Sequence, residues 1–63
     1  MIEYKVKIRI RAGADDYMDE DFTGVTYYYE KDAQDELKQA QLYIYNDNRF
    51  LMAWIDKVEV CAA

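Results

Sequence analysis

The stretch that decides the fold of this chain is Ile2-Glu3-Tyr4-Lys5-Val6-Lys7-Ile8-Arg9-Ile10-Arg11. Every even position holds an apolar or aromatic side chain, and every odd position holds a charged one. Because successive side chains of a β-strand point to opposite faces, this alternation predicts a strand over residues 2–11. We expect its even-numbered face to pack against a core and its charged face to stay open.

Two further elements are predicted downstream of this strand. Ala12-Gly13-Ala14 ends the strand, and the acidic stretch 15–21 is predicted to be a loop. Residues 23–30 are rich in Thr, Val and Tyr, which suit the pleated surface of a second strand. The residues of that strand expected to face the core are Val25, Tyr27 and Tyr29.

A helix is predicted next, with Asp32 as its N-cap and an end near residues 46–48. The residues expected on its apolar face, at helical spacing, are Ala33, Leu37, Ala40 and Ile44. Residues 50–60 predict a third strand, or two short strands separated by a bulge or turn near Asp56-Lys57. Its residues of common parity are Phe50, Met52, Trp54, Val58 and Val60, and Trp54 is expected in the core.

The order strand, strand, helix, strand predicts an α+β fold in a single domain spanning residues 1–63. The expected architecture has two layers: a three-stranded, mainly antiparallel sheet in the order 2-1-3, with the helix packed on one face. This arrangement buries the one apolar stripe that each element carries.

Composition excludes most catalytic chemistry. The 63 residues contain no His, one cysteine (Cys61) and two glycines, Gly13 and Gly24. This removes the commonest general base, the Cys–His nucleophile, a zinc site and a glycine-rich phosphate loop. The acids of residues 15–21 lack the spacing of a calcium-binding EF-hand loop. We therefore expect a protein that is not an enzyme and uses no cofactor or metal.

A lone cysteine, with neither a secretory signal pattern nor a membrane span, predicts a location in the cytoplasm.

Clustered carboxylates are the strongest functional signal in a chain of net charge −5. The acids that cluster in residues 15–36 are Asp15, Asp16, Asp19, Glu20, Asp21, Asp32, Asp35 and Glu36. Such a surface can imitate the phosphates of a nucleic-acid backbone and attract a groove lined by Lys and Arg. The predicted function is docking on a larger protein that handles nucleic acid, as an inhibitor or adaptor.

Two alternatives remain open. The odd-numbered face of residues 2–11 carries Lys5, Lys7, Arg9 and Arg11, and with Tyr28 beside it an open sheet could hold single-stranded nucleic acid. The net negative charge counts against direct nucleic-acid binding. The second alternative is a structural module that forms a homodimer through a sheet edge or the helix face, because so small a core leaves a thin energetic margin.

In general character the chain resembles the very small, acidic, single-domain accessory proteins of bacteriophages and mobile elements, including anti-CRISPR and other anti-defence inhibitors. The resemblance is carried by the small size, the acidity, the seven tyrosines and the lack of catalytic residue sets. Met1-Ile2-Glu3-Tyr4-Lys5-Val6-Lys7-Ile8 and the ending Asp56-Lys57-Val58-Glu59-Val60 also share that character. It implies binding and blocking of a host protein in the host cytoplasm, and it assigns no site residues.

Overall fold

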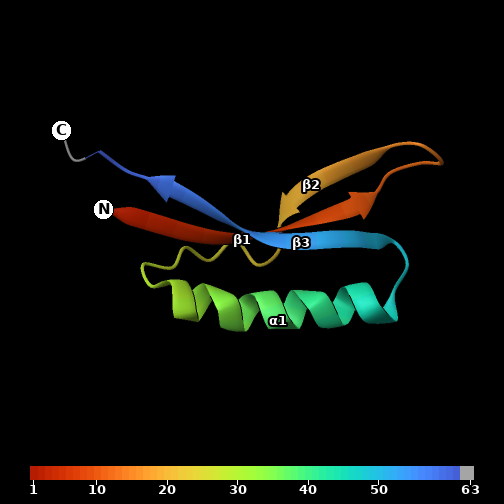
Figure 1. The fold of residues 1–63 in the computed structure, drawn as a ribbon. Helices are drawn as coiled ribbons and strands as arrows, with labels where there is room; N and C mark the ends of the chain where they lie inside the picture. The colour runs from red at the N-terminus through yellow and green to blue at the C-terminus, as the bar shows by residue number, and fades with distance from the viewer. Residues whose placement is uncertain (62–63) are drawn as a thin grey trace.

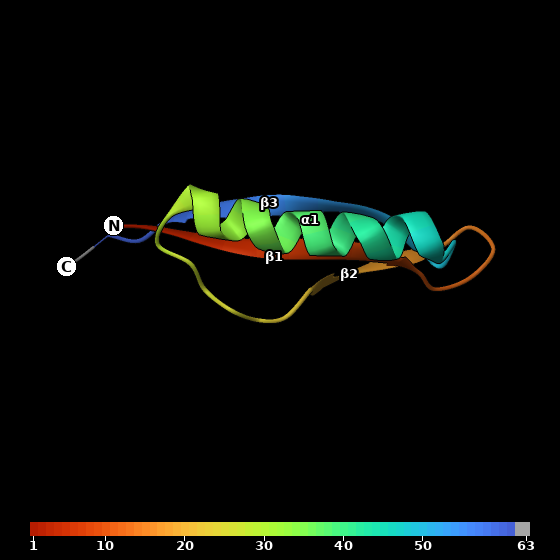
Figure 2. The same ribbon diagram turned by 90° about the horizontal axis from the view of Figure 1, so that it is seen from below.

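The structure is a computed structural model that describes residues 1–61. Its elements are β1 (Ile2–Arg11), β2 (Tyr17–Asp21), α1 (Glu30–Asn46) and β3 (Phe50–Glu59). The strands form an antiparallel sheet in the order β2-β1-β3, and α1 lies along one face of it (Figures 1 and 2). The predicted α+β class, the strand order and the single helix on one face are confirmed.

The second strand is not the predicted one. β2 consists of the acidic stretch that was predicted to be a loop, and it places Asp19 opposite Arg9 and Asp21 opposite Lys7. Oppositely charged residues facing each other across two strands stabilise the pair. The attraction between these side chains thus accounts for a strand where composition alone predicts a loop.

Residues 23–30 do not form the predicted strand. Gly24 has φ +81°, a left-handed conformation that interrupts an extended chain. The segment 22–29 instead runs from β2 to α1 and touches β1 through an isolated bridge between Tyr27 and Tyr4. Tyr27 packs against the core as predicted, whereas Val25 and Tyr29 are exposed.

The helix begins earlier than predicted and without the predicted cap. Its N-cap is Tyr29, which makes no side-chain capping hydrogen bond, so the assignment of Asp32 as N-cap is wrong. Asp32 lies in the first turn, where its charge still favours the positive end of the helix dipole. The predicted apolar face is confirmed: Ala33 and Ala40 are fully buried, and Leu37 and Ile44 pack against them.

β3 is one continuous strand, and its irregularity is not at Asp56. Asp56 pairs with Lys5 in regular register, while the register shifts near Leu51, which is left between the pairs Met52–Arg9 and Phe50–Ile10. This shift changes which face each residue occupies. The β3 residues that pack against the core are Phe50, Ala53 and Ile55. The expectation that Met52 and Trp54 share the core face with Phe50 is therefore wrong. Both pair with cationic residues on the open face.

The core that results is small. Its four buried apolar residues are Val6, Ile8, Ala33 and Ala40. The molecule is elongated and flat, with principal dimensions of 43 × 22 × 12 Å. Its accessible surface of 4824 Å² exceeds the roughly 4,200 Å² typical of a compact monomer of this mass. Much apolar side-chain surface consequently stays in contact with solvent.

Candidate functional site

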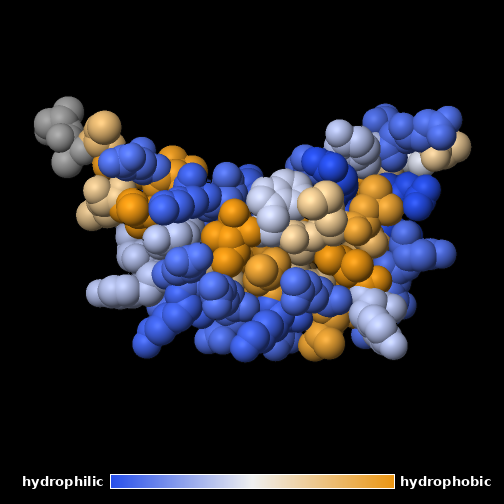
Figure 3. Space-filling model, in the orientation of Figure 1, coloured by the Kyte–Doolittle hydropathy of each residue, from blue (hydrophilic) through white to orange (hydrophobic). Residues whose placement is uncertain are grey.

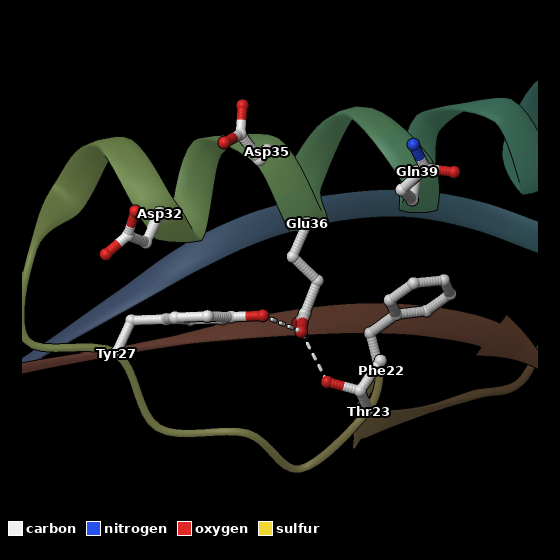
Figure 4. Close-up of a pocket in the computed structure, with 7 residues that line it drawn as sticks. All are labelled: Phe22, Thr23, Tyr27, Asp32, Asp35, Glu36 and Gln39. Carbon is white, nitrogen blue, oxygen red and sulfur yellow. Dashed lines mark hydrogen bonds between the residues drawn. The ribbon is translucent and has the colours of Figure 1, made fainter.

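A depression of the surface lies between the first half of α1 and the segment that follows β2. It has a volume of about 500 Å³ and is open to solvent. Figure 4 shows its lining residues. They are Phe22, Thr23, Tyr27, Asp32, Asp35, Glu36 and Gln39. We call this depression the acidic pocket.

Local structure explains how these side chains meet. The helical residues of the pocket recur at intervals of three and four, which places them on one side of α1. Across from them, the Phe22 N–H donates to the Val6 carbonyl (2.9 Å), and the Tyr27 N–H donates to the Tyr4 carbonyl (2.8 Å). These two backbone bonds hold segment 22–27 against β1 and form the second wall of the pocket.

Glu36 joins the two walls. It is only 7% exposed, and its Oε1 accepts hydrogen bonds from the Thr23 hydroxyl and from the Tyr27 hydroxyl (2.9 Å), as Figure 4 shows. Its other oxygen, Oε2, is buried without a hydrogen-bond partner among residues 1–61. The hydrogen bond to Glu36, together with burial, raises the pKa of the Tyr27 hydroxyl above its ordinary value. The carboxylate therefore anchors the 22–29 segment to the helix.

The chemistry of the pocket is that of a cation receptor. Three acidic residues, Asp32, Asp35 and Glu36, line the pocket together with the aromatic residues Phe22 and Tyr27, and no Lys or Arg lines the space. Figure 4 shows the Glu36 side chain pointing toward Tyr27 and Thr23, whereas the Asp35 carboxylate points away from them, toward solvent. Carboxylates bind ammonium and guanidinium groups through charge-assisted hydrogen bonds, and aromatic rings attract the same cations. A lysine or arginine side chain fits this arrangement.

The other predicted acids lie elsewhere. Asp19 receives two hydrogen bonds from Arg9, at 2.8 and 3.2 Å, and Asp21 forms an ion pair with Lys7 at 2.6 Å. Asp15 and Asp16 lie in the turn between β1 and β2, and Glu20 is exposed on β2 opposite Ile8. The eight predicted acids are thus distributed over the hairpin, the open sheet face and the pocket, and the structure brings Asp32, Asp35 and Glu36 together.

The predicted basic row lies on the open face of the sheet and is partly neutralised by its neighbours. Lys5 is directly opposite Asp56, and Arg11 is opposite Tyr17, while Lys7 and Arg9 are ion-paired. The guanidinium of Arg9 also lies over the ring of Tyr17, 4.1 Å from its centroid, and 5.4 Å from that of Trp54. Tyr28 was predicted to stand beside this row on a second strand. It is exposed in the 22–29 segment, which is not a strand.

These ion pairs predict how the aspartates titrate. The hydrogen bonds from Arg9 and Lys7 lower the pKa values of Asp19 and Asp21 below their ordinary value. A carboxyl group whose folded pKa is depressed stabilises the fold above its unfolded pKa of about 3.9, and this contribution is lost as the pH falls through the folded pKa. An NMR titration of the side-chain carboxyl carbons should show both groups titrating below the ordinary value of an aspartate. Arg9→Gln should return the pKa of Asp19 toward that ordinary value and leave that of Asp21 low. Ordinary midpoints for Asp19 and Asp21 in the unmodified chain would contradict the pairing.

Comparisons of the chain with family models, with curated proteins and with solved structures find no match. Within residues 1–61, no three or more His, Cys, Asp or Glu side chains are arranged to hold a metal ion. Over the same residues, no helix combines the length and the apolar character needed to cross a membrane.

Proposed function

We propose that this chain is a non-enzymatic binding protein that docks a basic segment of a larger, nucleic-acid-handling protein in the acidic pocket, as an inhibitor or adaptor. The observation that carries the proposal is an open depression lined by three acidic and two aromatic residues and by no positive side chain. A Lys or Arg that occupied a nucleic-acid groove of the partner would find there the charge and the ring faces that it prefers.

The charged groups outside the acidic pocket are less available to a partner than those that line it. Asp19 and Asp21 are bound by the chain's own Arg9 and Lys7, so a partner would have to displace those cations. Asp32 and Asp35 form no ion pair with any residue of the described part of the chain. The same ion pairs weaken the nucleic-acid alternative, because binding to phosphates depends on cations that are free to neutralise them.

A matched pair of charge variants tests the pocket. The double substitution Asp32→Asn and Asp35→Asn should weaken binding of a fluorescently labelled Arg- and Lys-rich peptide by about tenfold or more, since it removes two charge-assisted contacts. The control is Asp15→Asn with Asp16→Asn, which changes the net charge equally at the distant hairpin. Fluorescence anisotropy at low salt measures both affinities.

The outcomes separate the functional classes. If both double variants lose the same affinity, net charge rather than the pocket attracts the peptide, and the proposal is wrong. Tight binding of a labelled single-stranded oligonucleotide, lost in Arg11→Gln with Lys5→Gln, would instead support the open sheet face. A pull-down from nuclease-treated bacterial lysate with the unmodified chain and the Asp32→Asn, Asp35→Asn variant then identifies proteins that depend on the pocket.

A further inference from the structure

The two edge strands of the sheet, β2 and β3, differ in how well they are protected against pairing with another chain. β2 is five residues long, all five of its residues are exposed, and it has the sequence Tyr-Met-Asp-Glu-Asp. Short, charged strands are how proteins prevent a sheet edge from pairing with another chain. β3 is ten residues long, contains no proline, and carries no charge from Phe50 to Ile55. The β3 edge thus lacks the protection that the β2 edge has.

Backbone geometry shows which groups of β3 face outward. The Val60 N–H donates to the Met1 carbonyl, so the peptide groups of this residue point toward β1. In an antiparallel pair this orientation alternates from residue to residue. The N–H and C=O groups of Ala53, Ile55, Lys57 and Glu59 accordingly point away from β1, and no strand lies beside them within residues 1–61.

The surface around this edge is apolar. Figures 1 and 2 together place β3 on the side of the sheet nearest the viewer in Figure 1. Figure 3 has the same orientation and therefore shows the flank of the molecule that contains the β3 edge. On this flank a hydrophobic band lies between the sheet and the polar surface of the helix. The large apolar residues of this strand and its end that remain exposed are Leu51, Met52, Val58 and Val60.

The side of α1 turned away from the acidic pocket continues this surface. Gln34, Gln41 and Tyr45 recur there at helical spacing, opposite to Asp32 and Gln39. Glu30 and Lys38 lie on the same side, four residues before and after Gln34, and Tyr45 is 90% exposed. This flank of the helix therefore carries one acid and one base among uncharged side chains.

We propose that a second copy of this chain occupies the β3 edge, so that two β3 strands pair antiparallel and form a six-stranded sheet. Charge disfavours two of the possible registers. A two-fold axis at Asp56 or at Lys57 would place identical charges opposite each other, which is destabilising. An axis at Ile55 avoids this. The charged residues then lie opposite apolar ones, in the pairs Asp56–Trp54, Lys57–Ala53 and Glu59–Leu51.

The dimensions of the dimer agree with those of stable interfaces. Since α1 lies over β1 and β3 (Figure 2) and strands are about 4.8 Å apart, the two helices would lie roughly 10 Å apart, within normal helix-packing distance. The flank spans the two longer dimensions of the molecule, 43 and 22 Å, whose product of about 900 Å² is an upper limit for its outline and is close to the ~800 Å² of accessible surface that each partner buries in a standard interface. The acidic pocket faces the opposite side and stays open, so the dimer would carry two of them.

Sedimentation equilibrium of the unmodified chain, with a reducing agent to exclude a Cys61 disulfide, should give twice the 7.5 kDa chain mass at high micromolar concentration. Lys57→Pro removes an outward N–H from each copy without removing a bond to β1, and proline is tolerated at such edge positions. Its dimer dissociation constant should rise by about tenfold or more, because two interchain hydrogen bonds are lost. The matched control Lys57→Ala keeps the N–H and should dimerise like the unmodified chain.

Circular dichroism confirms that both variants are folded before their masses are compared. A monomeric mass for the unmodified chain at 1 mM would overturn the proposal. So would a Lys57→Pro variant that dimerises as tightly as Lys57→Ala, because the contact would then lie away from the β3 edge.

Discussion

Replacement of Ile8 by alanine is expected to reduce the free energy of unfolding by about 3 kcal/mol. Ile8 is 3% exposed and lies on the central strand β1, where it packs beneath the helix with Val6 and the two buried alanines. The loss combines the transfer free energy of the deleted carbons with the cavity that they leave. A domain of this length has a total stability of about 3–9 kcal/mol, so the variant should lose about a third or more of its stability.

Urea denaturation followed by circular dichroism, at one protein concentration, measures this effect. Val58→Ala is the control, because Val58 is an exposed aliphatic residue of the same sheet and its truncation should cost less than about 0.5 kcal/mol. Similar losses for the two variants would mean that the core does not lie where Val6, Ile8, Ala33 and Ala40 meet.

The elements predicted correctly are those whose signal is local. β1 follows from an alternation that repeats over ten residues, and the buried face of α1 follows from the spacing of Ala33, Leu37, Ala40 and Ile44. Both patterns reflect a repeat within one segment, so no other part of the chain is needed to interpret them.

The errors concern interactions between segments. β2 is a strand because Asp19 and Asp21 meet Arg9 and Lys7 on β1, and no window of sequence around residues 15–21 contains that information. The bulge near Leu51 is set by how β3 aligns with β1, and it reverses the expected faces of Met52 and Trp54. The left-handed conformation of Gly24, which interrupts the predicted strand over residues 23–30, depends on the path of the chain toward α1.

The candidate site was predicted in part. Asp32, Asp35 and Glu36 belong to the acids that the sequence singles out. The pocket also needs Phe22 and Gln39, and it needs Thr23 and Tyr27 from a segment predicted to be a strand. A signal for the role of Glu36 was present, because it lies three residues after Ala33 and four before Ala40, on the edge of the buried helix face. A charged residue at such a position breaks the apolar pattern, and such exceptions occur most often at functional or anchoring sites.

Replacement of Glu36 by alanine is expected to cost about 2 kcal/mol of stability and to release the 22–29 segment from the helix. The substitution removes the common acceptor of the Thr23 and Tyr27 hydroxyls and opens space in the wall of the pocket. In the unmodified chain, the cost of burying the unpartnered Glu36 Oε2 offsets part of the stabilisation that the two hydrogen bonds to Oε1 provide. The expected loss of stability is therefore about 2 kcal/mol, which is less than the full value of two charge-assisted hydrogen bonds. Glu36→Gln retains an acceptor and should lose less.

Asp35→Ala is the matched control, since it removes an equal charge from the adjacent, exposed position and should change stability by less than about 0.5 kcal/mol. Amide hydrogen exchange locates the effect: in Glu36→Ala the N–H groups of Phe22 and Tyr27, which bond to β1, should exchange faster, while those between β1 and β3 change only with global stability. A double-mutant cycle with Tyr27→Phe should show a coupling between Glu36 and Tyr27. If Glu36→Ala is as stable as Asp35→Ala and the exchange of Tyr27 is unchanged, Glu36 does not anchor the segment, and its burial serves the ligand of the pocket alone.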